Sequence, residues 1–266
     1  MPLTQLILLS IVQGLTEFLP VSSSAHLILA PIAAGMEDQS PLIDVMAHLG
    51  SLAAVAVYFH RDMQNIARGK LAWISGRMTS GGRLALLIGA ATPPVMLAAG
   101  LLYFTGQTDL FRSPLVIGIA TLVFAVPLWA ADKFCPSRKT VETLGYRDAF
   151  LIGLAQMFAL IPGASRSGVT MTTGRALGLG RSDAARFSML MAMPVIAAFG
   201  LVAGWDLAQS ETAGASLTDG LIVAVLSFFA AWASIAVMMR FVERVGFLPF
   251  VIYRLALAGL IFWFLV

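Results

Sequence analysis

The sequence has little of what soluble enzymes and secreted domains contain in abundance. Only 12% of its 266 residues are charged, three are histidines, and Cys135 is the single cysteine. One cysteine excludes an internal disulfide framework, so an oxidising compartment is neither required nor excluded. No G-x-x-x-x-G-K-[ST] motif occurs, which leaves ATP-driven work through a P-loop without support. The absence of a strand pattern and of a G-x-S-x-G motif argues against an α/β-hydrolase.

Apolar residues are abundant instead, and they come in long blocks. They make up 59% of the chain, and the mean hydropathy is +0.87. This composition predicts an all-α, polytopic membrane protein forming one integral membrane domain. The net charge of +3 comes from basic residues in the loops, so membrane topology explains it better than a nucleic-acid partner does.

Six blocks are long enough to span a bilayer, which takes about 20 mainly apolar residues. These blocks are about 41–59, 84–104, 114–131, 185–204, 220–239 and 249–266. Two further segments, 3–35 and 149–180, are each interrupted by a proline and a serine-rich stretch. Interrupted backbone is tolerated at membrane depth only where protein or water satisfies it, so both segments are predicted to be re-entrant hairpins. The first segment has no basic flank and is expected to be retained rather than cleaved as a signal peptide.

The basic residues predict how the chain is oriented, because short cytoplasmic loops are rich in lysine and arginine. Loops 60–83, 132–148 and 240–248 are basic and should be cytoplasmic. Loops 36–40 and 205–219 have no basic residue and loop 105–113 has one, so these three loops should be external. Successive loops alternate between the two sides of the membrane only if the first hairpin enters and leaves from outside and the second enters and leaves from the cytoplasm. Both termini then lie outside.

This topology predicts two inverted repeats, each one hairpin followed by three spans. The first repeat covers residues 1–132 and the second covers residues 146–266, and an offset of 142 aligns Pro20 with Pro162. Inverted repeats with broken helices commonly bind ligands at the repeat interface. Because that architecture is typical of transporters, a lipid-phosphate flippase or an anion transporter is the alternative to an enzyme.

The first hairpin carries an unusual set of polar side chains in its apolar segment. They are Gln13, Glu17, Ser22, Ser23, Ser24 and His26. A carboxylate costs about 2.5 to 3.5 kcal/mol at the centre of a spanning helix, so one without a local partner indicates a functional site. Gln13 and Glu17 lie four residues apart and therefore share one helix face.

The second hairpin supplies a cation and more hydroxyl groups, in Ser165, Arg166, Ser167 and Thr170. Serines after a helix break are typical N-caps, so Ser22 and either Ser165 or Ser167 predict two helix N-termini pointing inward. Helix N-termini bind phosphate, and the arginine fork matches two phosphate oxygens. The two hairpins are therefore predicted to meet and bind a polyanion at the membrane.

An acid, an imidazole, a hydroxyl and an arginine suit phosphoryl transfer. Ser23, His26 or water could attack phosphorus, and His26 could carry the proton. Glu17 would orient His26 or help to hold a divalent cation, while Arg166 would stabilise the charge on the phosphoryl oxygens. Two other polar residues are expected to have structural roles. His48 would pack or line a pore, and Arg254 would snorkel from a helix end.

Two long motifs resemble the undecaprenyl-diphosphate phosphatase family linked to bacitracin resistance. They are Gly14-Leu-Thr-Glu-Phe-Leu-Pro-Val-Ser-Ser-Ser-Ala-His26 and Pro162-Gly-Ala-Ser-Arg-Ser-Gly168, and shorter matches include Leu49-Gly-Ser51 and Pro249-Phe-Val-Ile-Tyr-Arg254. The resemblance implies a membrane hydrolase of the bacterial inner membrane that removes the terminal phosphate of undecaprenyl diphosphate and recycles the lipid carrier for peptidoglycan synthesis. It also implies a site open to the periplasm and a divalent cation, Mg or Ca, while a homodimer stays open.

By position, the family's acidic motif falls on Glu17, its hydroxyl run on Ser22 to Ser24, its histidine on His26, and its arginine motif on Ser165 to Ser167 with Thr170. The chain departs from the family at two places. Gln13 stands where many members have a first glutamate, and Ser24-Ala25 stands where Thr-Gly is common.

Overall fold

The computed structural model describes residues 1–35, 40–107, 111–209 and 216–266. The predicted external loops 36–40, 105–113 and 205–219 therefore lie partly outside the described residues. The longer helices are α1 (Leu3–Thr16), α2 (Ser23–Ala34), α3 (Pro41–Tyr58), α4 (His60–Ile74), α5 (Ser80–Ala91), α6 (Pro93–Phe104), α7 (Pro114–Val123), α8 (Ala125–Phe134), α9 (Tyr146–Gln156), α10 (Arg166–Ala176), α11 (Arg181–Gln209), α12 (Leu217–Val245) and α13 (Leu248–Phe264). Two short 3₁₀ helices, η1 (Val141–Thr143) and η2 (Met157–Leu160), complete the order.

The all-α membrane fold is confirmed, with some changes in the predicted spans. Within the described residues, five helical stretches are long and apolar enough to cross a membrane: Pro41–Tyr58, Ser80–Phe104, Pro114–Phe134, Arg181–Leu207 and Leu217–Val245. The sixth predicted span, 249–266, is α13, a shorter apolar helix of 17 residues. The second stretch is two helices, α5 and α6, separated at Thr92, because Pro93 and Pro94 cannot donate main-chain hydrogen bonds.

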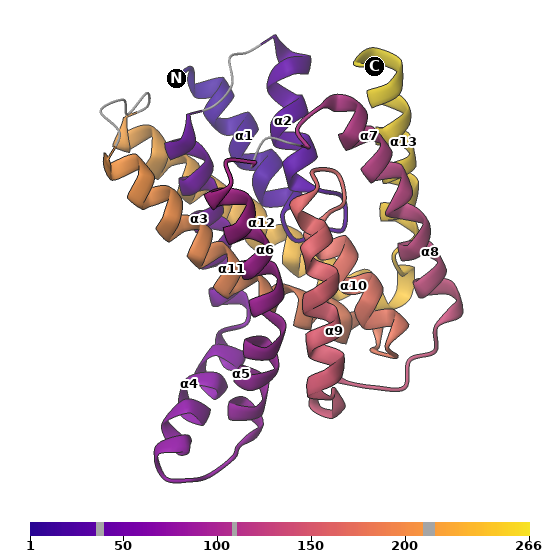
Figure 1. The fold of residues 1–266 in the computed structure, drawn as a ribbon. Coiled ribbons are helices and arrows are strands. Elements are labelled where there is room, and N and C mark those ends of the chain that lie inside the picture. Colours follow the sequence, from indigo (N-terminus) through magenta and orange to yellow (C-terminus); the bar gives the residue numbers. More distant parts are fainter. Residues whose placement is uncertain (36–39, 108–110, 210–215) are drawn as a thin grey trace.

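Loop 60–83 is largely helical, which the sequence reading did not predict. It contains α4 and the start of α5, and these helices form the antiparallel pair that projects from the lower end of the molecule in Figure 1. The pair is tightly packed, since a Cβ on Gly69 would lie 2.1 Å from the amide nitrogen of Gly82. Two ion pairs join this end of the bundle: Arg186 contacts Asp62 at 2.6 Å and Glu142 at 2.9 Å.

The two interrupted segments are both helix–turn–helix hairpins, α1–α2 and α9–η2–α10. In Figure 1 the first hairpin descends from the end that carries both termini, and the second rises from the opposite end, so their tips meet inside the bundle. In each hairpin a serine with positive φ directly precedes the second helix. These serines are Ser22, with a φ of 76°, and Ser165, with a φ of 69°. The division into repeats 1–132 and 146–266 stays a prediction.

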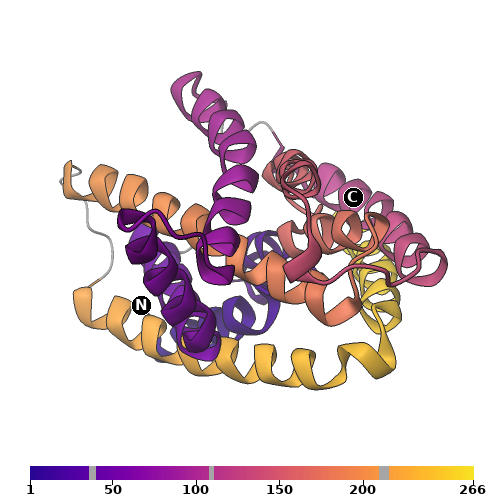
Figure 2. The ribbon, with the colours of Figure 1, turned by 90° about the horizontal axis from the view of Figure 1, so that it is seen from below.

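Long helices enclose the first hairpin. Figure 2 shows α11 and α12 diverging on either side of α3, and α12 also packs against α1. The crossing of α3 and α12 depends on glycine, because a Cβ on Gly50 would lie 2.1 Å from the carbonyl oxygen of Ala224. This packing holds α1, and with it Glu17, against the middle of α3.

Candidate active site

The two hairpin tips are joined by direct hydrogen bonds. The Gly163 amide donates to Ser22 Oγ at 3.2 Å, and Ser167 Oγ donates to the Leu19 carbonyl at 2.7 Å. The Gly163 backbone has a φ of +96°, and a Cβ there would lie 2.4 Å from the Ile117 carbonyl oxygen, so only glycine fits this approach. The predicted meeting of the two tips is confirmed.

Glu17 is the centre of the polar cluster between the tips. It is only 7% exposed. Its Oε1 accepts a hydrogen bond from Arg166 Nη2 at 2.8 Å, while Oε2 accepts from Ser23 Oγ at 2.7 Å and from Gln13 Nε2 at 3.1 Å. The Arg166 guanidinium also lies over the Phe18 ring, 5.6 Å from its centroid. The acid of one hairpin and the cation of the other thus form one buried ion pair.

Each tip opens a helix with the same serine arrangement. Ser22 Oγ lies 3.2 Å from Ser24 Oγ and accepts from the Ala25 amide, while Ser165 Oγ lies 3.2 Å from Ser167 Oγ and accepts from the Gly168 amide. These pairs correspond at an offset of 143, so the sequence offset of 142 is wrong for the tips. The reason is one additional residue between the proline and the cap serine in the second hairpin.

Two predicted site residues point elsewhere. Thr170 lies one turn into α10, where its hydroxyl contacts the Arg166 carbonyl at 2.9 Å and Ser188 Oγ at 2.6 Å. Its described contacts therefore fasten α10 to α11 and do not reach Glu17. The imidazole of His26 lies between the Ser22 carbonyl, 2.6 Å from Nδ1, and the Tyr253 hydroxyl, 2.6 Å from Nε2.

Arg254 is a site residue that the sequence reading missed. The sequence predicts that this arginine snorkels from a helix end, but in the structure Arg254 is 0% exposed. Its guanidinium donates to the carbonyl of Pro20 in the first tip and to those of Gly163 and Ala164 in the second, at 3.4, 2.9 and 3.2 Å. Two further bonds reach α7 carbonyls. Arg254 therefore joins both tips to α7 and α13 and adds positive charge beneath them; its place in the Pro249–Arg254 motif was the only sequence signal.

His48 is a second residue whose position the sequence did not indicate. Its Nε2 lies 3.8 Å from Glu17 Oε2, within ion-pair distance. The sequence predicts packing or pore lining for His48, because its nearest acidic neighbour along the chain is Asp44. The tertiary fold supplies the acid from α1 instead.

The donor set does not fit a divalent cation held by the protein alone. Glu17 is the carboxylate of the cluster, and donors already occupy both of its oxygens, with the Arg166 cation on one of them. The described residues contain no group of three or more His, Cys, Asp or Glu side chains placed to hold a metal ion. Mg and Ca prefer several oxygen ligands. The Gln13 Oε1 atom is buried without a partner, but one free amide oxygen does not complete such a site.

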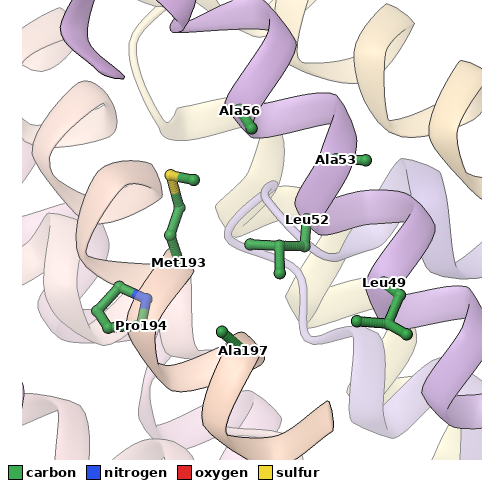
Figure 3. A pocket seen from close by; sticks show the side chains of 7 residues that line it. All are labelled: Leu49, Leu52, Ala53, Ala56, Met193, Pro194 and Ala197. Carbon is green, nitrogen blue, oxygen red and sulfur yellow. The ribbon is translucent and has the colours of Figure 1, made fainter. Parts of the chain in front are cut away.

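An apolar groove lies between α3 and α11 (Figure 3). Its volume is about 470 Å³. The lining side chains come from both helices: Leu49, Leu52, Ala53 and Ala56 from α3, and Met193, Pro194 and Ala197 from α11. His48 adjoins this lining on α3, and its ring lies 5.2 Å from that of Phe199 on α11. The interface of α3 and α11 thus carries both the groove and the contact between His48 and Phe199.

A family model for the bacitracin resistance protein BacA matches residues 6–260. This chain belongs to the BacA family. The BacA match includes the tips of both hairpins and Arg254, so it spans the whole cluster described above. Known relatives are similar over nearly their full length. The chain is 62% identical to an undecaprenyl-diphosphatase of Maricaulis maris, covering 99% of this chain and 100% of the relative.

Two further relatives extend the comparison. An undecaprenyl-diphosphatase of Ruegeria pomeroyi is 48% identical over 97% of this chain and 96% of its own length. Undecaprenyl-diphosphatase 2 of Stutzerimonas stutzeri is 47% identical over 98% of this chain and 97% of its own length. The family predicted from the two motifs is thus confirmed.

Proposed function

We propose that this BacA-family chain is an undecaprenyl-diphosphatase. It hydrolyses undecaprenyl diphosphate to undecaprenyl phosphate and inorganic phosphate, which recycles the lipid carrier for peptidoglycan synthesis and confers bacitracin resistance. The observation that supports this function best is the Glu17–Arg166 pair, with Ser23 on the same carboxylate, where two helices begin. A buried acid beside a cation and a hydroxyl that stand at two helix N-termini has the chemistry of a phosphate site.

The diphosphate would bind between the two tips. Amide groups at the starts of α2 and α10 supply hydrogen-bond donors and the positive ends of two helix dipoles, and Arg166 supplies the fork. The hydroxyls that line the two tips are those of Ser22, Ser24, Ser165 and Ser167. Gln13 donates a hydrogen bond to Glu17, and the Thr170 hydroxyl joins α10 to α11. Binding displaces Arg166 from Glu17 toward the phosphate oxygens.

Ser23 is the nucleophile in this proposal, because its hydroxyl already donates to Glu17. Its oxygen bonds to the terminal phosphorus, the bridging P–O bond breaks, and undecaprenyl phosphate leaves while Glu17 takes the hydroxyl proton. Water then attacks the phosphoserine, the Ser23 oxygen leaves with a proton from that water, and inorganic phosphate is released while the proton on Glu17 passes to solvent or product. Arg166 stabilises the charge on the phosphoryl oxygens in both steps. His26 holds the first tip against Tyr253.

In this proposal a divalent cation would accompany the substrate as its counter-ion, because the described residues do not complete a site for it. Such an ion would offset part of the negative charge of the diphosphate. In this proposal the prenyl chain lies along the groove between α3 and α11, whose lining side chains are all apolar. The groove and the tips together match a ligand with a charged head and an apolar tail.

The alternative is a flippase or anion transporter without chemistry, and one assay separates the two. Purified protein in detergent, with Mg²⁺ and undecaprenyl diphosphate, has no second compartment into which a lipid could be moved. An undecaprenyl-diphosphatase releases inorganic phosphate there at a rate proportional to the amount of protein. A preparation that binds the lipid but releases no phosphate would support the transporter.

The orientation of the chain in the bacterial inner membrane is part of the proposal. Both termini and the opening of the site would face the periplasm. The Met1 ammonium contacts Asp219 at 3.1 Å, so the N-terminus lies at the same end as the start of α12. Two cysteine probes report on the two ends: the natural Cys135 in the predicted cytoplasmic loop, and Thr218→Cys in a Cys135→Ser background.

In cells whose outer membrane has been made permeable and whose inner membrane is intact, a membrane-impermeant maleimide should label the Thr218→Cys probe. The same reagent should reach Cys135 only after the inner membrane is opened. Labelling of Cys135 with the inner membrane intact, and protection of Thr218→Cys, would reverse the proposed orientation.

A further inference from the structure

His48 is fixed on α3 in a way that determines which of its nitrogens is free. Its Nδ1 lies 2.7 Å from the Asp44 carbonyl oxygen, one helical turn earlier. A carbonyl only accepts hydrogen bonds, so Nδ1 carries a proton in the neutral as well as the charged ring. The lone pair of the neutral imidazole is therefore on Nε2. That nitrogen is the one 3.8 Å from Glu17 Oε2.

Glu17 Oε2 is the atom that receives the proton of Ser23, because the Ser23 hydroxyl donates to it. Arg166 donates to Oε1, and Ser23 and Gln13 both donate to Oε2. Gln13 is an amide and cannot take up the proton. The Nε2 atom of His48 is a titratable acceptor on the Oε2 side, 3.8 Å from that oxygen.

The other two histidines are not available for this task. His26 donates from Nδ1 to the Ser22 carbonyl, which leaves Nε2 to accept from the Tyr253 hydroxyl, so both of its nitrogens are occupied within the protein. His60 is exposed at the start of α4, and its Nδ1 lies 3.0 Å from the Val57 carbonyl. His48 is thus the imidazole whose free nitrogen faces the cluster.

We propose that His48 accepts, through Glu17, the proton that Ser23 loses when its oxygen attacks phosphorus. This inference rests on the proposed hydrolysis. The Ser23 O–H bond breaks, the proton passes over Glu17 Oε2 to His48 Nε2, and the resulting imidazolium pairs with the Glu17 carboxylate. Water later supplies the proton that returns to the Ser23 oxygen. The proton on His48 leaves to solvent or product, because the side chain is 20% exposed.

Glu17 is an ionic partner of His48 in the described part of the chain. Glu17 faces it from α1, with Arg166 of α10 behind that carboxylate, while α11 presents the Phe199 ring. Asp44 is one turn away on α3 itself. The charged residues of α12 and α11 lie toward the ends of those helices: Asp219, Arg240, Glu243 and Arg244 on α12, and Arg181, Asp183, Arg186 and Asp206 on α11. A carboxylate beside an imidazole stabilises the imidazolium once it forms.

The test is the pH dependence of kcat for phosphate release by His48→Gln. Glutamine has similar length and can hydrogen-bond to Glu17, but it cannot gain a proton. A proton-transfer group contributes about 100-fold or more, so kcat should fall by about that factor while KM changes less than about threefold. The wild type should lose activity as the pH falls and His48 becomes protonated in advance, and the variant should lack this acid limb. If His48 had only a structural role, its replacement would not remove the acid limb of the pH profile.

His60→Gln is the matched control, because that imidazole has the same kind of Nδ1 bond to a carbonyl but lies away from the tips. It should retain the wild-type kcat and pH profile. If His48→Gln lowers the thermal midpoint, His48→Asn serves as the second variant, since its amide can replace the Nδ1 bond to Asp44. A folded His48 variant with a kcat within about threefold of the wild type and the same acid limb would overturn the inference. Wild-type protein without phosphate release would instead overturn the proposed hydrolysis.

Discussion

Replacing Arg166 by alanine is expected to lower kcat/KM for phosphate release by about 100- to 1000-fold. The guanidinium is the cation that joins the two tips, 2.8 Å from Glu17, and in the proposed reaction it turns to the phosphoryl oxygens. Arg166→Lys should recover only part of the loss, because lysine keeps the charge without the planar fork. Release of inorganic phosphate from undecaprenyl diphosphate in detergent measures both variants.

The matched control is Arg147→Ala, which removes an exposed arginine from the first arm of the same hairpin. It should leave both the rate and the thermal midpoint near the wild-type values. A folded Arg166→Ala protein with near-normal turnover would remove this arginine from the mechanism. It would also show that the ion pair with Glu17 serves only to fasten the tips.

Replacing Ser23 by alanine should have the larger effect, a loss of about 1000-fold or more in kcat, because no phosphoserine can form. Its hydroxyl is the one that donates to Glu17, at 2.7 Å. Rapid acid quenching of wild-type protein with substrate labelled in the terminal phosphate should trap label on the chain. The alanine variant should trap none.

Thr16→Ala provides the control for a lost hydroxyl next to the cluster. The Thr16 hydroxyl donates to the Val12 carbonyl within its own helix, so its removal should not change turnover or trapping. Normal turnover by Ser23→Ala would mean that water attacks the phosphorus directly, with Glu17 as its base. Label trapped on a residue other than Ser23 would identify a different nucleophile.

The membrane fold and the family were predictable from the sequence because each depends on local signals. Twenty apolar residues span a bilayer wherever they occur, and a proline followed by serines interrupts a helix without reference to any neighbour. The polar residues of both hairpins were found for the same reason, since Glu17 and Arg166 are conspicuous in apolar segments. Local signals of this kind also led to the prediction that the two hairpins meet.

Only the tertiary structure decided which side chains share the cluster. His48 lies 31 positions after Glu17 and belongs to another helix, and no local pattern connects them. Arg254 has the sequence surroundings of a snorkelling residue, yet the fold buries it against carbonyls of both tips. His26 was conspicuous in its motif, but its contacts run to Tyr253.

The sequence by itself determined the apolar helices, the two interruptions and the chemical types of the residues near them, because these follow from composition and short-range backbone preferences. The tertiary structure decided the distances between those residues. Packing of α1 and α3 against α12, with Gly50 allowing close approach, brings His48 to Glu17. Contacts between residues far apart in the chain depend on how whole helices pack, and that information is not contained in any single segment.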